Sequence, residues 1–407
     1  MESITYKKDK YIYWQKYAKK VYIETEEAFI ALYNELTTNA KELTGYKTVP
    51  SDWDGYTYSV YDQDGMSVVY VADHTKYYMF IYDKLERSKK LFRKTFKEME
   101  HITLSNAFNT VSSDLFRNCV PKPIYYMDKQ FAYYTLDGVN YIDANSMYSY
   151  CAKGRLPDAK TGIRIDGYAK PTEDYPFAFY INSGHCAEYG VFDTHDYMKL
   201  DSNMKKSLLY VSHNNKTYPK YKNVDDIDEV TILMKPSTIT FDRTIDYIYK
   251  LKLSGDADAK LALNRFYGTL HPNPDNKGFA TKRGKSLYSY YHIAAIIKGR
   301  ANQMQLEKKA QIENDGGIVL QMVVDSVIYI GDTCYGDNTK LLGHYDNEFI
   351  NVRYRSNDKM NRYVLEKDNK FVKICISGYK EYDVVINKIE DVDKYTQDTE
   401  YVTERNK

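Results

Sequence analysis

Two apolar runs separated by a short polar segment stand out near the start of the chain. Residues 67–72 and 77–82 are rich in Val, Tyr and Ile, and the four residues between them are polar. Apolar runs of this length around a polar turn predict a β-hairpin. A charged helix is predicted to follow, in which basic residues alternate with Glu98 and Glu100. This pattern favours a solvated helix face over a nucleic-acid contact.

A second hairpin is predicted late in the chain, where the apolar runs 318–324 and 327–330 meet at Asp325-Ser326. Earlier, residues 139–143 have the pattern of a buried strand that runs into a helix. The other predicted helices are 26–43, 245–267 with a break at 255–256, and 288–313, and the other predicted strands lie in 155–240, 352–365 and 371–376. Long helices alternating with separated strands indicate an α+β fold.

The amino-acid composition excludes few classes of function. The chain has 407 residues, and its 57 Lys and Arg against 56 Asp and Glu give a net charge of +1. A basic surface for nucleic acid would therefore have to be local. The 44 tyrosines leave two interpretations open, namely an amphipathic filler in a codon-biased genome and a supply of stacking faces for bases.

Cysteine usage and the amino-terminal sequence bear on location. The five cysteines are scattered and form no Cys-x-x-Cys pair, which argues against a disulfide framework or a zinc site and fits a reducing compartment. The first residues lack the apolar core of a signal peptide, and no apolar run is long enough to span a bilayer. We expect a soluble cytoplasmic protein with no membrane partner.

Two segments place a carboxylate at the end of a predicted strand. A carboxylate such as Asp143, at a strand end, is rigidly placed and suits a Mg²⁺ ligand, although a helix N-cap is the alternative. Asp325 interrupts a buried apolar run, which is costly unless it lies at a turn or binds a metal. A plain hairpin turn is the alternative at Asp325-Ser326.

A third segment presents polar groups on one helix face. Lys260, Asn264 and Tyr267 are spaced at i, i+4 and i+7, so they share a face. Gly268 follows them and suits a helix C-terminal cap. A cation, an amide and an aromatic ring together could bind a nucleotide triphosphate and base, and an ordinary amphipathic helix is the alternative.

Taken in order, the three segments resemble motifs of the protein-primed family B DNA polymerases of phages and linear plasmids. Asp143-Ala-Asn-Ser-Met-Tyr148 is similar to that family's Asp-x-x-Ser-Leu-Tyr motif. Lys260-x-x-x-Asn264-x-x-Tyr267-Gly268 is similar to its Lys-x-x-x-Asn-Ser-x-Tyr-Gly helix, and Val323-Val-Asp325-Ser326 to its Asp-Thr-Asp-Ser hairpin. The resemblance extends over residues 110–390 and is poor before them.

The resemblance implies a right-hand polymerase with a palm of antiparallel sheet and helices, fingers and a short thumb, after a reduced N-terminal domain. The implied divisions are 1–110 for the N-terminal domain, 111–157 and 301–345 for the palm, 158–240 for an insertion resembling the first terminal-protein region, 241–300 for fingers with a short insertion at 269–287, and 346–407 for the thumb.

The resemblance also implies roles for individual residues. Asp143 and Asp325 would bind two Mg²⁺ ions, for which Mn²⁺ can substitute, with the Ala144 carbonyl as a further ligand. Tyr148 would lie under the nucleotide sugar and exclude a 2′-hydroxyl. Lys260, helped by Lys250, would neutralise the triphosphate. The base-pair pocket would be lined by Asn264, Tyr267 and Gly268.

DNA contacts are expected in two places. Tyr363, flanked by Lys359 and Arg362, is predicted to hold the primer end, and Lys380-x-Tyr382 is the alternative. The insertion at 269–287 contains Lys282 and Arg283, part of a basic patch suited to phosphate contacts, and a solvated loop is the equal alternative there.

The chain also departs from the family pattern. Val323 replaces the first Asp of the hairpin motif, which removes one carboxylate from the implied metal site. The family's amino-terminal 3′–5′ exonuclease carries an Asp-x-Glu motif, and residues 1–110 contain none. We therefore expect no intrinsic proofreading, unless a separate exonuclease subunit supplies it.

The prediction for function is a template-directed DNA polymerase of phage or plasmid replication that transfers dNMP from dNTPs onto a primer 3′-OH or a protein hydroxyl. Its expected partners are the DNA template and primer, dNTPs and a terminal priming protein. A catalytically impaired module that binds DNA or a terminal protein is the alternative, and a chance match in an unrelated α+β protein is the third hypothesis.

Overall fold

The computed structural model describes residues 19–23, 41–42, 57–63, 66–72, 77–108, 114–194, 229–271, 290–379 and 384–396. The chain divides into two units. The first comprises residues 1–95 and 250–265, and the second comprises residues 96–249 and 266–407. The second unit contains both predicted aspartates.

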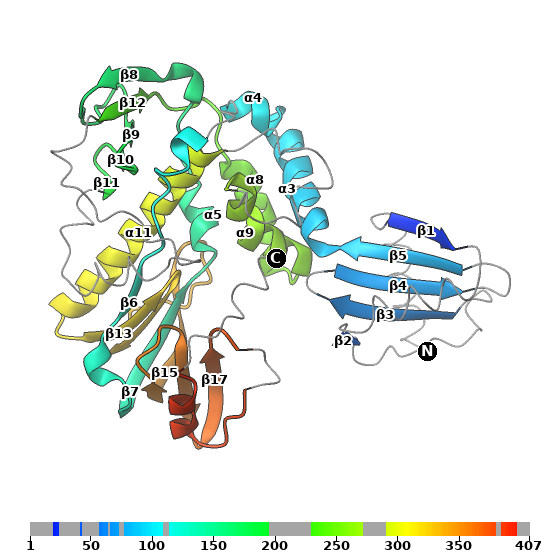
Figure 1. The fold of residues 1–407 in the computed structure, drawn as a ribbon, viewed down its shortest axis with the longest axis vertical. Helices are drawn as coiled ribbons and strands as arrows, with labels where there is room; N and C mark the ends of the chain where they lie inside the picture. Colours follow the sequence, from blue (N-terminus) through cyan, green and yellow to red (C-terminus); the bar gives the residue numbers. More distant parts are fainter. Residues whose placement is uncertain are drawn as a thin grey trace. The chain divides into compact units, whose positions relative to one another are not determined.

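An antiparallel sheet is the main element of the first unit (Figure 1). Its strands are β1 (Lys19–Ile23), β2 (Lys41–Glu42), β3 (Thr57–Gln63), β4 (Met66–Ala72) and β5 (Tyr77–Asp83), in the order β1-β5-β4-β3-β2. The pairing of β4 with β5 confirms the first predicted hairpin. Helix α3 (Lys84–Glu100) confirms the charged helix that follows. The helix predicted over 26–43 is wrong at its end, where Lys41–Glu42 is a strand, and residues 24–40 lie outside the described residues.

A seven-stranded antiparallel sheet organises the second unit. Its strands are β6 (Tyr125–Met127), β7 (Thr135–Ala144), β13 (Ile318–Val323), β14 (Ser326–Ile330), β15 (Tyr345–Ser356), β16 (Arg362–Lys367) and β17 (Lys370–Ile376), in the order β17-β16-β15-β7-β14-β13-β6. Both the second predicted hairpin and the strand ending near Asp143 are present, as β13–β14 and β7. The three strands after residue 344 continue this same sheet.

A smaller antiparallel sheet lies between β7 and α8 in the sequence. It consists of β8 (Ile163–Asp166), β9 (Phe177–Tyr180), β10 (His185–Glu188), β11 (Phe192–Asp193) and β12 (Val230–Met234), in the order β11-β10-β9-β12-β8. These strands fall in the segment that the sequence marks as rich in strand and turn signals. Residues 195–228 lie outside the described residues.

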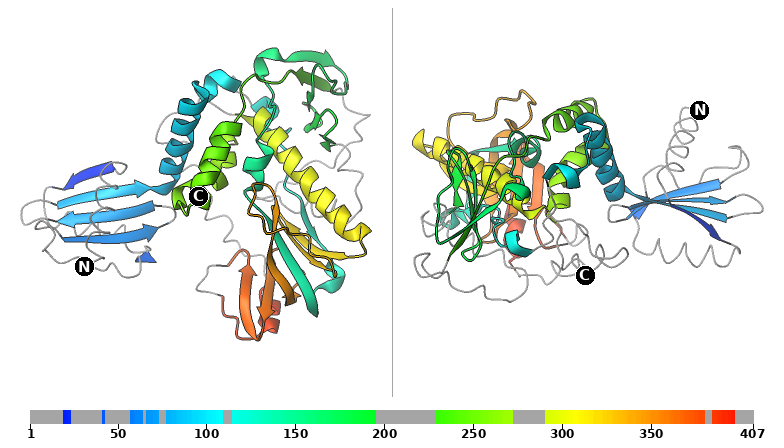
Figure 2. Two further views of the ribbon diagram at one scale, coloured as in Figure 1. Left: turned by 180° about the vertical axis from the view of Figure 1, so that it is seen from behind. Right: turned by 90° about the horizontal axis from the view of Figure 1, so that it is seen from above.

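The helices are α4 (Leu104–Phe108), α5 (Met147–Cys151), α8 (Asp242–Leu253), α9 (Ala257–Leu270) and α11 (Tyr291–Asn314), with short 3₁₀ turns at Asp114–Phe116, Lys129–Phe131, Ala159–Thr161 and Ile389–Lys394. The break between α8 and α9 confirms the predicted interruption at 255–256, where Gly255 has φ 92°. Figures 1 and 2 show α11 along one face of the seven-stranded sheet. Residues 291–297 at the start of α11 are all buried and, apart from His292, apolar, as expected for a helix enclosed by other elements.

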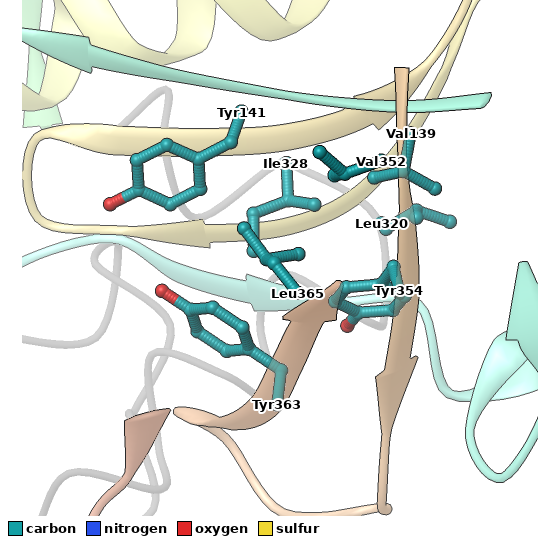
Figure 3. Close-up of a cluster of buried hydrophobic side chains, with 8 residues drawn as sticks. All are labelled: Val139, Tyr141, Leu320, Ile328, Val352, Tyr354, Tyr363 and Leu365. Atoms are coloured by element: carbon teal, nitrogen blue, oxygen red, sulfur yellow. The ribbon is translucent and has the colours of Figure 1, made fainter. Parts of the chain in front are cut away.

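The opposite face of the sheet has its own apolar cluster, drawn in Figure 3. Val139 and Tyr141 of β7 pack there with residues of β13 to β16, namely Leu320, Ile328, Val352, Tyr354, Tyr363 and Leu365. Residues 139, 141 and 143 alternate along the strand and therefore share a face. Asp143 thus continues the row of side chains that this cluster begins.

A close approach to Phe192 of β11 fixes the position of α11. A Cβ built on Gly299 would overlap the Phe192 ring, which is itself buried. Glycine is required there because the helix backbone lies against the ring. The residues on either side of Gly299 are Lys298 and Arg300, so this contact also places two charged side chains.

We expect Gly299→Ala to destabilise the protein by about 1–3 kcal/mol, the usual cost of overpacking, even though alanine favours helix formation. Chemical denaturation would measure the change. Phe192→Leu in the same chain removes ring atoms that the new methyl group overlaps, so the double variant should recover part of the loss. A Gly299→Ala protein as stable as the unmutated chain would contradict the packing argument.

Candidate functional site

The structure brings Asp143 and Asp325 together at the end of β7. The register of β14 with β7 places Ser326 opposite Asp143. The backbone N–H of Ala144 donates to the carbonyl oxygen of Asp325 at 2.9 Å. The two aspartates, 182 positions apart in the sequence, are therefore neighbours, Asp143 on β7 and Asp325 in the turn directly before β14.

One row of paired residues across the sheet contains both Asp143 and Val323, the residue that stands where the family pattern has an Asp. Val323 pairs with Ser326, Ser326 with Asp143, and Asp143 with Asp346 of β15. Opposed residues in an antiparallel sheet share a face, so Val323 lies on the same face as Asp143, two strands away. Asp346 is buried, and Lys340 Nζ donates to its carboxylate at 2.6 Å. Burial raises the pKa of Asp346, but the contact with Lys340 outweighs it and the net pKa is lowered.

Asp325 lies in surroundings that favour a neighbouring cation. Burial raises its pKa, and the charges of Lys373 and Lys298 oppose that rise. Lys373 of β17 is held in place, because its Nζ donates to the Tyr141 hydroxyl at 2.5 Å. A half-buried carboxylate whose ionised form is costly gains from a bound metal ion.

Strained backbone lies beside each aspartate. Val324, directly before Asp325, has φ 55°, and Ser146, which begins α5, has φ 49°. A β-branched residue in the left-handed region is a true outlier. Such conformations cost about 1–3 kcal/mol and cluster at functional sites, which supports a functional interpretation of this turn.

A series of stacked rings lies close to Asp325. Tyr148 of α5 stacks on Tyr267 of α9, with ring centroids 4.6 Å apart and planes 17° apart. Tyr267 stacks in turn on His271 at 6.2 Å, and His271 meets Tyr291 edge-on at 5.2 Å. Burial, then Arg117 and Lys298, lower the pKa of His271 to about 4, so its imidazole is neutral at pH 7. The site is thus bordered by flat aromatic faces next to carboxylates.

Lys298 of α11 lies at the hydroxyl end of Tyr148. It is 5% exposed, and its ammonium donates to the Tyr148 hydroxyl. Its Nζ lies 4.4 Å from the Tyr148 ring centroid and 5.6 Å from that of Tyr267. Burial lowers the pKa of Lys298 to about 7, although Asp325 opposes the shift.

This lowered pKa predicts a pH-dependent stability. A lysine in the unfolded chain titrates near 10.4, so between pH 7 and 10 the unfolded state binds more protons and stability rises with pH. We expect the difference in unfolding free energy between the unmutated chain and Lys298→Met to rise by on the order of 1 kcal/mol per pH unit in that range. Urea unfolding at pH 7, 8 and 9 with a chelator would measure it, and a pH-independent difference would contradict it.

Arg300, two residues further along α11, fixes the segment after α5. Its guanidinium forms two hydrogen bonds with the Glu188 carboxylate, at 2.7 and 2.5 Å. It also donates to the carbonyl oxygens of Cys151 at 3.0 Å, Lys153 at 2.9 Å and Arg155 at 2.6 Å. This side chain joins the smaller sheet, α11 and the end of α5, and so helps to hold Tyr148.

The predicted triphosphate-binding residues lie on α8 and α9. Lys260 and Asn264 are exposed residues of α9 in the first unit, and Lys250 is an exposed residue at the end of α8. The prediction that Gly268 caps the C-terminus of the helix is wrong, because α9 continues to Leu270. Leu270 is buried, so apolar contact extends the helix past the glycine.

The predicted primer-binding residues are in buried or half-buried positions. Tyr363 is 3% exposed in the cluster of Figure 3, where its hydroxyl points toward that of Tyr141. Arg362 is buried and donates to the carbonyl oxygens of Ser377 and Tyr395. Lys359 is half-buried. These placements give Arg362 and Tyr363 contacts within the sheet, and the role of holding the primer end stays a prediction.

Lys282 and Arg283 lie outside the described residues. Conversely, Lys298, Arg300 and Lys373 are at or near the site and were not predicted. The sequence did contain a signal for Lys298 and Arg300. Both directly follow a run of apolar residues on a predicted helix, and such a run has to be buried. No comparable signal marks Lys373, which reaches Tyr141 only through the pairing of distant strands.

Within the described ranges, no three His, Cys, Asp or Glu side chains form a group that could hold a metal ion. The candidate site is therefore a pair of carboxylates. In the same part of the chain, no helix is both long and apolar enough to cross a membrane.

Comparison by sequence gives no relatives. Neither a scan against protein-family profiles nor a search of curated protein sequences finds a match to this chain.

Comparison by structure finds several forms of one enzyme. The chain is similar to phi29 DNA polymerase complexed with primer-template DNA, with a TM-score of 0.52 and 16% identity over 74% of this chain. It is similar to the ternary complex with primer-template DNA and incoming nucleotide at 0.52 and 15%, and to the complex with single-stranded DNA at 0.52 and 17%. The chain spans 62% of the length of these neighbours. The protein therefore has a mixed fold, with an antiparallel sheet, that is similar to that of phi29 DNA polymerase.

Proposed function

We propose that this protein is a template-directed DNA polymerase that transfers a deoxynucleotide onto a primer 3′-hydroxyl or a protein hydroxyl. The observation that carries the proposal is the meeting of Asp143 and Asp325 at the end of β7, in a fold similar to that of a DNA polymerase. Phosphoryl transfer depends mainly on positioned charge, and paired carboxylates at rigid strand ends provide a place for it.

The donor set fits Mg²⁺, with Mn²⁺ as a substitute. Mg²⁺ is commonly bound by one or two carboxylates together with substrate phosphates, and Asp143 and Asp325, with the Ala144 carbonyl, would hold two such ions. When bound, the ions would lower the pKa of the attacking hydroxyl and neutralise charge on the triphosphate. The protein's own contribution is the fixed separation of the two carboxylates, set by the pairing of β7 with β14.

The nucleotide would lie against the stacked rings. Tyr148 would face the sugar, and Tyr267 with Asn264 and Gly268 would line the base pair. Lys260, with Lys250, would neutralise the triphosphate. The ring stacking of Tyr148 on Tyr267 supports this proposal, because aromatic faces beside carboxylates suit a base and its phosphates.

In domain terms, we assign strands β6, β7, β13 and β14 with α5 and α11 to the palm, and α8 with α9 to the fingers. The segment 158–240 would bind a terminal protein, and 346–407 would form a thumb whose strands continue the palm sheet. The amino-terminal unit would be a reduced domain without proofreading, so an exonuclease would be a separate subunit. Template and primer DNA would be the remaining partners.

A second candidate function is a binding module that has lost its chemistry. Val323 favours it, because this residue lies in the row of Asp143 where a further carboxylate would be expected. The two candidates differ in one observable, which is incorporation of a nucleotide.

Extension of a labelled primer on a DNA template with Mg²⁺ or Mn²⁺ would decide between them. The polymerase proposal expects metal-dependent incorporation of the deoxynucleotide that pairs with the template. Tight DNA binding without incorporation under either metal would overturn it in favour of the binding module.

A further inference from the structure

Lys298 is a buried lysine without a salt bridge to any of the residues that the structure describes. Among the residues that the structure describes, its hydrogen bond goes to the Tyr148 hydroxyl, and no carboxylate lies within salt-bridge distance of it. A buried charge without a salt bridge is costly. Its retention at 5% exposure therefore indicates a task that an apolar residue would not perform.

The surroundings of Lys298 indicate what that task is. The ammonium contacts Tyr148 twice, by a hydrogen bond to its hydroxyl and by its position 4.4 Å from the ring centroid. One face of the Tyr148 ring is stacked on Tyr267, with ring centroids 4.6 Å apart. The Tyr148 hydroxyl is thus fixed by the Lys298 ammonium and one face of its ring is fixed by Tyr267, so neither its χ1 nor its χ2 angle can change without breaking a contact.

The element that carries Lys298 is itself fixed. The neighbouring Gly299 backbone lies against the Phe192 ring, and Arg300 binds Glu188 and three carbonyl groups. The Lys298 ammonium is therefore supplied from a rigid support, as precise positioning of another side chain requires.

We infer that Lys298 is a positioning residue that locks the Tyr148 ring and thereby sets the discrimination between deoxyribonucleotides and ribonucleotides. The inference rests on the proposed function, in which Tyr148 faces the nucleotide sugar. A pocket discriminates weakly against a ligand that is larger by one hydroxyl when its wall can yield. A ring fixed at its hydroxyl and by stacking on one face cannot yield, so the extra 2′-hydroxyl would meet a fixed surface.

The test compares kcat/KM for dATP and ATP in four proteins, namely the unmutated chain, Lys298→Met, Tyr148→Phe and the double variant. Methionine matches lysine in length and removes a buried charge, so the fold should persist, and a thermal unfolding midpoint would check it. We expect the dATP-to-ATP ratio to fall about tenfold in Lys298→Met, as for loss of a hydrogen bond to a charged group. Tyr148→Phe, which removes only the hydroxyl, should lower the ratio similarly, and the double variant should lose no more than either single one.

A merely structural role would reduce kcat/KM for both nucleotides equally and leave their ratio unchanged, which would overturn the inference. Additive losses in the double variant would overturn it as well, since the two residues would then act independently. If Lys298→Met does not fold, an unchanged ratio in Tyr148→Phe alone overturns the inference.

Failure of the proposed function would look different, because the unmutated chain itself would then incorporate neither nucleotide. In that case the same ratio is measured as binding affinity for dATP and ATP with Ca²⁺. Equal ratios in the unmutated and Lys298→Met proteins, or no binding of either nucleotide, would overturn the inference.

Discussion

Asp325→Asn should lower nucleotide incorporation by roughly 10³-fold or more while the protein stays folded. Asparagine has nearly the same size, so the hairpin turn and its hydrogen bond to Ala144 persist. Removing the charge takes away several kcal/mol of metal-dependent stabilisation, and each 1.36 kcal/mol is a factor of ten in rate. Single-turnover incorporation with saturating dNTP would measure the effect.

Two comparisons make this result interpretable. Asp143→Asn should cause a loss of similar size, because both carboxylates belong to one site. Asp332→Asn, an exposed aspartate just beyond the end of β14, is the matched control and should have no effect. Incorporation retained within tenfold by Asp325→Asn would contradict the assignment of this residue to the metal site.

Arg300→Met should lower the free energy of unfolding by about 3–5 kcal/mol, because breaking a buried ion pair leaves its partner charge uncompensated. The variant leaves the Glu188 carboxylate without its two hydrogen bonds and three carbonyl oxygens without a donor. Urea denaturation monitored by tyrosine fluorescence would measure the loss.

The double variant Arg300→Met with Glu188→Met is the control, since it removes both charges and fills the space with apolar atoms. It should be more stable than Arg300→Met alone, as replacement of a buried ion pair by apolar residues often costs little. An Arg300→Met protein within 1 kcal/mol of the unmutated chain would contradict the role given to this contact.

Local elements of this fold could be predicted, and their assembly could not. The β4–β5 and β13–β14 hairpins and the break between α8 and α9 follow from apolar runs, polar turns and Gly255. The order of the seven-stranded sheet depends on pairing between strands as distant as β7 and β15. Such pairing depends on side-chain packing between distant segments, for which a single sequence carries no periodic signal.

The same distinction applies to the site. Asp143 and Asp325 could be predicted because each interrupts or ends an apolar strand, and their contact follows from β7–β14 pairing. Lys298 and Arg300 were missed because helical periodicity identifies α11 as buried without showing what its charged residues meet. The burial of Tyr363 results from β15–β16 pairing, which the sequence pattern does not reveal, and its DNA-binding role stays a prediction.

Single-nucleotide incorporation by the purified chain tests the central claim most directly. Four primer-template duplexes that differ only in the templating base would each be given one dNTP at a time, with Mg²⁺ and then Mn²⁺. A template-directed polymerase adds the complementary nucleotide on each duplex and requires the metal. Absence of incorporation on all four duplexes with both metals, or addition that ignores the templating base, would contradict the proposed function.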